Sequence, residues 1–437
     1  MNEIIAATES IAPYLTQVQL KQLRHIILAM LCMTGRVTML GLSRWTEGGG
    51  SYRTVQRWFH SRVDWGMVLW MSVKGRLSKG KVYMLAGDDV VVGKAGKKTH
   101  GLGRFYSSIA QRAIPGLSFF VLSVLDVEKR QSHPIRVEQH LPSPKQPAAE
   151  KPKRGRGRPK GSRSYSKAPP VLSAELQRIG KVLASVGTWA AGFNMRHVVL
   201  DGFFGNGPSA WVVQQQGFHL ISKLRHNAAL FWPYTGHKPK RGATPRYGDR
   251  VDYAHLPLDK RCSSLTEHAI CTDTYQLTVC NKEFAHPLNV VILLKTHLKS
   301  NKQAHVMLFS TDLSLSAAQM VDYYSLRFQI EFNFRDAKQY WGLEDFMTLT
   351  AQAVTNAVNL AFLMVNLSSA LLHPYRQRHT DFSVLDLKAL FRARRYLRET
   401  IKLLPDSPTP DFISRLWRSV SRCVGSLRPL HLHHLAA

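Results

Sequence analysis

The sequence predicts an α/β protein, because segments typical of strands alternate with helical segments along its 437 residues. Residues 1–75 and 346–437 carry apolar side chains at the mixed three- and four-residue spacing of helices. Between them, short apolar runs end at Gly, Asp or charged residues, as strands do. We therefore expect a sheet-containing core flanked by helical N- and C-terminal regions.

The chain carries a formal net charge of +30, far from the near-balance of ordinary globular proteins. A polyanionic partner accounts for such an excess, and nucleic acid is the commonest one. An anionic membrane surface is the rival. No segment has the pattern of an amphipathic anchor, and the most apolar run, residues 356–372, is interrupted by Asn and Ser. We expect nucleic acid as the partner and no membrane.

The cysteines favour a reducing compartment. There are five of them, an odd number, with no C-x-x-C pair. The N-terminus also lacks the basic-then-apolar pattern of a secretory signal. We expect a cytoplasmic protein.

Residues 1–75 are expected to form a DNA-binding domain of the helix-turn-helix kind. A short helical segment, a glycine-rich turn and a second, basic helix follow one another there. On the second helix, Arg53 and Arg57 would project outward while Val55, Trp58 and Phe59 pack inward. An ordinary helical bundle is the alternative.

Two of the predicted strands run into aspartates. Residues 82–86 lead to Asp88 and Asp89, and residues 195–200 lead to Asp201. Aspartates at the carboxyl ends of strands lie at the rim of a sheet, where a site can open to solvent.

Residues 142–170 are predicted to form a basic linker, since Pro, Gly, Ser and Lys/Arg dominate them. Nine Lys/Arg and one acidic residue supply +8 of the +30, so most of the charge lies elsewhere. Within the linker, Arg156-Gly-Arg158-Pro resembles an AT-hook, a strip thin enough to place guanidinium groups in a narrow minor groove. A generic basic linker is the alternative.

The remaining boundaries follow from the same patterns. The alternating segments of residues 230–305 are expected to form a β-rich insertion, and the helical residues 346–437 to serve DNA contact or dimerisation. The core then comprises residues 80–229 and 306–345.

Tyr324 and Lys338 are predicted to lie on one helix, because neither Gly nor Pro occurs between them. At 100° per residue, Arg327 and Glu331 fall on the same stripe as these two residues, between apolar flanks. A solvated stripe with i,i+4 ion pairs is the alternative, and Arg335 on this stripe is expected to pair with Glu331.

Asp88, Asp201 and Glu331 are the candidate catalytic residues. Three carboxylates brought together repel one another and raise each pKa unless a cation compensates them. Mg²⁺ prefers oxygen ligands, and two such ions, with Mn²⁺ as a substitute, would support in-line phosphoryl displacement. In a chain this basic, the trio predicts an enzyme that acts on nucleic acid.

The pattern Tyr-x2-Arg-x3-Glu-x6-Lys, present as Tyr324, Arg327, Glu331 and Lys338, resembles the signature of one group of DDE transposases of bacterial insertion sequences, the insertion-sequence-four type. The Asp-Gly-Phe at Asp201 is similar to the second Asp motif of that group.

The first Asp motif of the group usually reads Asp-x-Thr. Here Val90 stands in place of the Thr, so Asp88 is preferred as the first carboxylate and Asp89 is the alternative. The resemblance runs from about residue 80 to residue 345.

The resemblance implies a ribonuclease-H-like core, with a mixed five-stranded sheet and helices on both faces, interrupted by a β-rich insertion before the Glu helix. It implies two Mg²⁺ held by Asp88, Asp201 and Glu331, cleavage at terminal inverted repeats and joining of 3′ ends to target DNA. Tyr324, Arg327 and Lys338 would contact DNA phosphates, with Trp232 as a candidate for base stacking. A homodimer on double-stranded DNA, in the nucleoid of a bacterial cytoplasm, is expected.

Two other functions remain. One is a ribonuclease-H-like nuclease without strand transfer, and the other is a non-catalytic DNA-binding regulator derived from a transposase. The intact carboxylate trio argues against the second of these.

Overall fold

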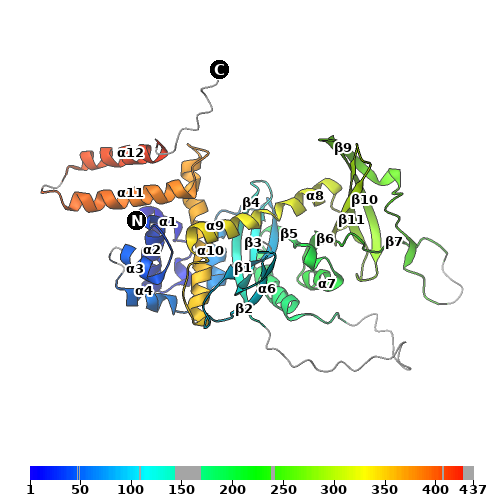
Figure 1. The fold of residues 1–437 in the computed structure, drawn as a ribbon, viewed down its shortest axis with the longest axis horizontal. Helices are drawn as coiled ribbons and strands as arrows, with labels where there is room; N and C mark the ends of the chain where they lie inside the picture. Colours follow the sequence, from blue (N-terminus) through cyan, green and yellow to red (C-terminus); the bar gives the residue numbers. More distant parts are fainter. Residues whose placement is uncertain are drawn as a thin grey trace, which may run out of the picture.

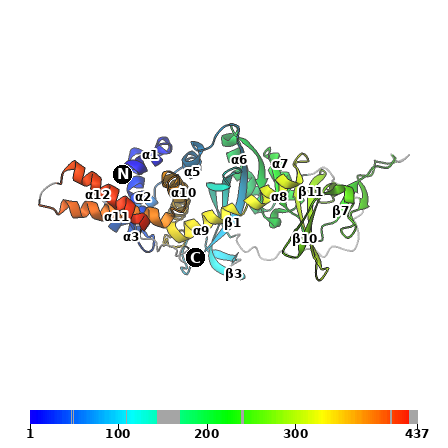
Figure 2. The same ribbon diagram turned by 90° about the horizontal axis from the view of Figure 1, so that it is seen from above.

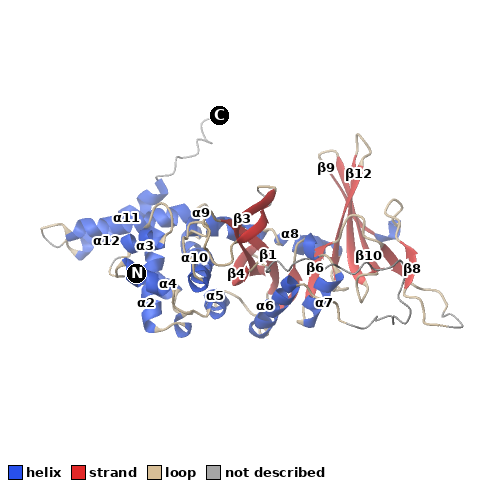
Figure 3. Ribbon diagram, turned by 60° about the horizontal axis from the view of Figure 1, so that its bottom comes forward, coloured by secondary structure: helices blue, strands red, loops and turns tan. Residues whose placement is uncertain are grey.

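The computed structural model describes residues 1–46, 48, 50–107, 110–142, 169–237, 242–405 and 408–426, the last six without their side chains. The molecule is elongated, and its two sequence ends contribute to the same helical end (Figure 1). The core sheet with its covering helices lies in the middle, and further strands form the other end (Figure 3).

Helices occupy the N-terminal 75 residues. They are α1 (Asn2–Ala7), the 3-10 helix η1 (Ala12–Tyr14), α2 (Gln17–Cys32), α3 (Met39–Trp45), α4 (Tyr52–Phe59) and α5 (Trp65–Lys74). On α4, Val55, Trp58 and Phe59 are buried while Arg53 and Arg57 are exposed, because this short helix covers the core with one face only.

The core sheet is mixed. Its strands are β1 (Val82–Gly93), β2 (Gly103–Ser107), β3 (Arg112–Asp126), β4 (Gln131–His140), β5 (Asn194–Val199) and β6 (His219–Lys223). β3 pairs antiparallel with β1, β2 and β4, whereas β5 runs parallel to both β1 and β6. The order β4-β3-β1-β5-β6 is compatible with a ribonuclease-H-like fold.

The sheet continues beyond β6. The added strands are β7 (Leu230–Pro233), β8 (Tyr247–Arg250), β9 (Arg261–Glu267), β10 (Ile270–Asn281), β11 (Leu288–His297) and β12 (Gln303–Ser310), with a 3-10 helix η3 (Leu258–Lys260). β12 pairs antiparallel with β6 and so joins the two parts into one twelve-stranded sheet.

Helices cover both faces of the core. They are α6 (Ala174–Ala190), the 3-10 helix η2 (Gly202–Phe204), α7 (Gly207–Gln215), α8 (Ala317–Leu326), α9 (Gln329–Trp341) and α10 (Ala351–Arg376). Met84 and Ala86 of β1 pack in the core that includes α9 and α10, whereas Tyr83 and Leu85 pack in the core that includes α6. Side chains of β1 are therefore divided between two helical layers.

α10 is the one helix in the described part of the chain that is long and apolar enough to cross a membrane, but 83% of its apolar window is buried inside the protein. Two buried asparagines fix its neighbours. Asn356 donates to the carbonyls of Phe59 (2.7 Å) and Ser61 (2.8 Å), and Asn366 donates to the carbonyl of Pro134 (2.8 Å). α10 is thus a central helix of the core, and its buried asparagines join it by hydrogen bonds to the N-terminal helical region and to β4.

The C-terminal helices α11 (Val384–Lys402) and α12 (Pro410–Ser426) lie beside the N-terminal helices (Figure 1). The arginines of α11 are used within the chain. Arg392 donates to the carbonyl of Cys32 at the end of α2 (2.8 Å), Arg394 binds Glu3 (3.0 Å), and Arg395 donates to the carbonyl of Trp45. Part of the positive charge of this region therefore ties helices together.

His133 of β4 provides a test of the packed core. It is buried, and this burial, with the neighbouring Arg76 and Lys129 cations, lowers the pKa of His133 to about 3. An unfolded histidine binds a proton below about pH 6.5, so the unfolded chain gains about 1.4 kcal/mol for each pH unit below that value.

We expect His133→Leu to remove this part of the pH dependence. Denaturant unfolding at pH 7.5 and 5.0 should show a smaller loss of stability on acidification than in the wild type. His379→Leu, at an exposed position, should behave like the wild type. Equal pH dependence in all three proteins would refute the buried neutral state of His133.

Candidate catalytic carboxylate site

Asp88 and Asp89 lie in the middle of β1 rather than at its end. The expectation that the strand stops before them is wrong, because β3 continues the antiparallel ladder through Asp88↔Val121 and Asp89↔Phe120 as far as Gly93↔Gly116. The β-branched residues after Asp89 favour this extension.

The two aspartates point to opposite faces of the sheet. Asp88 lies on the α9 side, where its Oδ2 is 2.5 Å from Nη1 of Arg327. Asp89 lies on the α6 side, where desolvation and the carboxylate of Glu175 raise its pKa to about 6. Side-chain alternation therefore places only Asp88 on the side of Glu331.

Asp201 follows β5 and caps η2. Its Oδ1 accepts a hydrogen bond from the backbone N–H of Phe203 (3.1 Å), and its carbonyl accepts one from Ser222 Oγ of β6 (2.6 Å). Gly205 closes the loop against β6, since an added Cβ there would collide with the carbonyl oxygen of Lys223. The turn that carries Asp201 is thus fixed to the adjacent strand.

Tyr324 and Lys338 do not share one regular helix, contrary to the expectation. Tyr324 belongs to the last turn of α8, Arg327 lies at the break, and Glu331 lies in the first turn of α9. The backbone N–H of Arg327 donates to Tyr324 (3.2 Å), and that of Glu331 to Phe328 (3.1 Å). These three-residue bonds tighten the chain locally into a 3-10 turn, which a composition without Gly or Pro does not reveal.

The signature cations make specific contacts. Arg327 binds Asp88, and Lys338 donates to the carbonyl of Val91 (3.0 Å) and pairs with Glu344 (3.0 Å). The expected pairing of Arg335 with Glu331 is wrong, because Arg335 pairs with the adjacent Asp336 (2.8 Å).

The charges converge on Asp88. Its pKa is raised to about 6, mainly by desolvation and also by the carboxylates of Glu331 and Asp201, whereas Arg327 opposes the rise. The hydroxyl of Tyr324 lies in the same field, since burial and the nearby Asp201 and Asp88 charges raise its pKa although Arg327 opposes them. The charges of Glu331 and Asp201 therefore both act on the carboxylate of Asp88.

The three carboxylates fit a hard divalent cation, which prefers oxygen ligands. Added positive charge would reduce the repulsion that Glu331 and Asp201 exert on the partly buried Asp88. In this structure Arg327 provides that charge. Within the described ranges, no three His, Cys, Asp or Glu side chains gather closely enough to hold a metal ion. Binding of a cation by all three carboxylates thus requires them to move closer together.

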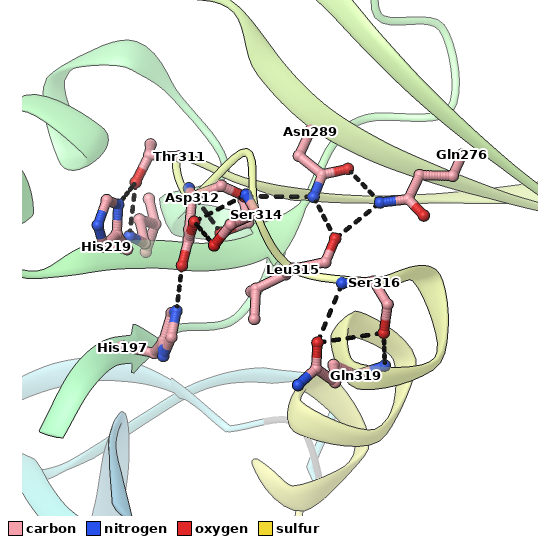
Figure 4. A network of polar contacts seen from close by, with 12 residues as sticks. His197, His219, Gln276, Asn289, Thr311, Asp312, Ser314, Leu315, Ser316 and Gln319 are labelled. Atoms are coloured by element: carbon pink, nitrogen blue, oxygen red, sulfur yellow. Dashed lines mark hydrogen bonds and ion pairs between the residues drawn. The ribbon is translucent and has the colours of Figure 1, made fainter. Parts of the chain in front are cut away.

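A polar network fixes the start of α8, and so the approach of the helical segment to the sheet (Figure 4). The carbonyl of Leu315 accepts hydrogen bonds from Gln276 (2.7 Å) and Asn289 (2.8 Å), and Ser316 and Gln319 form a capping box. Next to it, His197 of β5 lies 2.9 Å from Asp312. Although burial opposes it, hydrogen bonds from Ser314 and His197 lower the pKa of Asp312 to about 2, so this anchor is ionised.

Other predicted DNA contacts lie away from the carboxylates. Arg53 and Arg57 are exposed on α4, and Trp232 is half-buried in β7. Arg156 and Arg158 lie outside the described residues. Arg53, Arg57 and Trp232 therefore do not lie next to Asp88 in this structure.

Sequence reasoning missed the polar groups that β6 contributes. Ser222 holds the Asp201 turn, and Lys223 and Arg225 are exposed directly after it. The cations Lys223 and Arg225, directly after the apolar residues 220–221, were the available signal, but pairing of β6 with β5 was needed to place them next to Asp201.

The fold and the three carboxylates are compatible with a ribonuclease-H-like nuclease. The family model described as DDE superfamily endonuclease matches residues 11–282. Because the match covers more than half of the 437 residues, the chain belongs to the DDE superfamily endonucleases.

Comparison with curated proteins finds no match. The residues matched by the family model include Asp88 and Asp201 and end before Glu331. The family implies a DNA substrate and nuclease or transposase chemistry, typically with divalent metal ions.

Gly205 tests the support of the Asp201 turn. We expect Gly205→Ala to lower stability by about 1–3 kcal/mol, because the new methyl group meets a backbone carbonyl that cannot rotate away. Thermal unfolding of the metal-free protein measures the effect.

Gly192→Ala is the matched control, since nothing lies within 4 Å of a Cβ at that position. If both substitutions leave the melting temperature unchanged, the turn is not held against Lys223 as described.

Proposed function

We propose that the protein is the transposase of a bacterial insertion sequence, of the insertion-sequence-four type group. It would bind the terminal inverted repeats of its element as double-stranded DNA, cut at their ends and join the 3′ ends to target DNA. The observation that carries the proposal is the ion pair of Asp88 with Arg327 of the signature, close enough to Glu331 for its charge to raise the pKa of Asp88, in a chain of the DDE superfamily endonucleases. The net charge of +30 supports a DNA substrate.

Asp88, Asp201 and Glu331 would hold two Mg²⁺ ions, or Mn²⁺ in their place. When bound, such ions supply an activated water or 3′-hydroxyl and stabilise the leaving oxygen. The raised pKa of Asp88 means that a divalent cation competes there with a proton as well as with Arg327.

Tyr324, Arg327 and Lys338 would position the DNA backbone beside the carboxylates. In this role Arg327 exchanges Asp88 for a phosphate, and Lys338 exchanges Glu344. Arg53 and Arg57 of α4 would contact the repeats in a helix-turn-helix manner, and Arg156 and Arg158 the minor groove. A homodimer on DNA, in the nucleoid of the cytoplasm, would bring two element ends together.

The alternative is an endonuclease without strand transfer, which the description of the matched family also permits. Product analysis separates the two, because only a transposase converts cut ends into joints with a target plasmid.

The carboxylate assignment predicts a split between binding and cutting. With Mg²⁺, the protein should nick a duplex that carries the inverted repeat bordering its gene. Asp88→Asn, Asp201→Asn and Glu331→Gln should bind this duplex and cut it more than about 100-fold more slowly, because each would remove a metal ligand. Gel assays of binding and cleavage measure both.

Asp89→Asn is the matched control and should cut at close to the wild-type rate, since Asp89 faces α6. Loss of cleavage in Asp89→Asn with normal cleavage in Asp88→Asn would exchange the two assignments.

The contact between Arg327 and Asp88 predicts competition between the guanidinium and a metal ion. In the absence of DNA, Arg327→Gln should bind Mn²⁺ about fivefold more tightly, equivalent to about 1 kcal/mol. Electron paramagnetic resonance of free Mn²⁺ measures this without any catalytic step.

Arg335→Gln removes the same charge from an arginine that pairs with Asp336, so its Mn²⁺ affinity should match the wild type. Equal affinities for all three proteins would show that Arg327 does not occupy the metal position.

A further inference from the structure

A cavity of about 370 Å³ lies directly beside the Asp201 turn. Its lining combines Gly202 of that turn with Lys223, Arg225 and His226, which follow one another at the end of β6, and with His305 of β12. None of the described acidic side chains lines it. The cavity is therefore a basic hollow next to the candidate catalytic carboxylates.

The walls of this hollow are fixed by the sheet. Lys223 pairs with Leu308 of β12, and the N–H of Leu224 donates to the carbonyl of Met307 (2.9 Å). His305 Nε2 lies 2.8 Å from the carbonyl of His226, and its ring stacks on Tyr253. Lys223 thus projects from a strand pair, and Arg225 and His226 follow it in a short turn that hydrogen bonds on either side hold against β12.

Among the described residues, Lys223 and Arg225 of the hollow differ from the cations near Asp88 because they have no carboxylate partner. Lys223 and Arg225 are exposed and form no ion pair with any side chain that the structure describes. Arg327 and Lys338, in contrast, are paired with Asp88 and Glu344. Unpaired cations in a concave surface are a favourable place for phosphate groups.

The hollow has a defined place relative to the carboxylates. The sheet order β1-β5-β6-β12 sets Asp201 between Asp88 on one side and Lys223 on the other. The Ser222 hydroxyl and the close approach of Gly205 to the Lys223 carbonyl couple the hollow to the Asp201 turn. A DNA strand that crosses the carboxylates from α9 would therefore continue into the hollow.

We propose that Lys223, Arg225 and His226 bind the phosphate backbone of the DNA outside the element, immediately beyond the bond to be cut. This assignment rests on the proposed function. It adds a binding site for the DNA beyond the cleaved bond, which the proposed contacts of Tyr324, Arg327 and Lys338 do not include. The occupant is duplex DNA flanking the uncut end. Lys and Arg at the hollow would hold it by charge, with no requirement for its sequence.

The test compares two duplexes with the full-length protein in EDTA, so that no cleavage occurs. One duplex carries the inverted repeat with about ten base pairs of flanking DNA, and the other ends at the cleavage position. We expect Lys223→Gln/Arg225→Gln to bind the flanked duplex about tenfold more weakly and to leave the other unchanged. The slope of log affinity against log salt should fall by about 2 for the flanked duplex only, because about two phosphate contacts are lost. Fluorescence anisotropy between about 50 and 300 mM salt measures both.

Two controls accompany the double variant. Lys299→Gln removes an exposed lysine from the turn between β11 and β12 and should bind like the wild type. Arg225→Lys keeps the charge and should keep the salt slope.

Other outcomes overturn the proposal. A double variant that retains the preference for flanked DNA shows that the hollow binds no flank, and equal losses on both duplexes show a general charge effect. Normal flanked binding with weaker capture of a target duplex assigns the hollow to target DNA instead. A wild type that binds the repeat no better than unrelated DNA refutes the proposed function, and this inference with it.

Discussion

Burial of β1 on both faces is the constraint on which the rest of the molecule depends. Met84 and Ala86 must face the layer of α9 and α10, and Tyr83 and Leu85 must face α6. This pattern fixes the direction of every later side chain in the strand, so the adjacent Asp88 and Asp89 cannot serve the same site. A slip of one residue would exchange them and turn Asp88 to the α6 side, away from Arg327.

The helical segment that meets Asp88 is held from both ends by distant parts of the chain. At the start of α8, the distal strands supply Gln276 and Asn289 to the Leu315 carbonyl. At the end of α9, Gly342 adopts a left-handed conformation (φ 73°) against Val37, whose N–H donates to Asp345 (2.9 Å). The segment runs along the long axis between these anchors (Figure 2). The distance from Glu331 to Asp88 is therefore set jointly by the N-terminal helices and the strands beyond β6.

The positive charge of the chain has two different uses. In α11, Arg392 and Arg394 satisfy a helix end and a carboxylate of the N-terminal helices, so they stabilise the fold. Lys223 and Arg225, in contrast, have no such partner among the described residues and face a hollow. The net charge thus overstates the number of cations that can bind a polyanion. The contacts within the fold show which cations are already paired and which can bind one.

The sequence by itself determined the features that depend on local pattern. Residue type and spacing singled out Asp88, Asp201 and Glu331, and apolar periodicity separated helical from strand segments. Those signals are local because side-chain direction repeats every two residues in a strand and every 3.6 in a helix.

Tertiary structure decided the features that depend on contacts between distant parts of the chain. The extent of β1 is set by its ladder with β3, and the 3-10 turn at Arg327 appears only in the hydrogen bonds of the folded chain. The pairing of Arg335 with Asp336, and the place of Lys223 beside Asp201, follow from which strands and carboxylates the fold brings together. A carboxylate or cation in a sequence has many possible neighbours, and only the packed chain selects one.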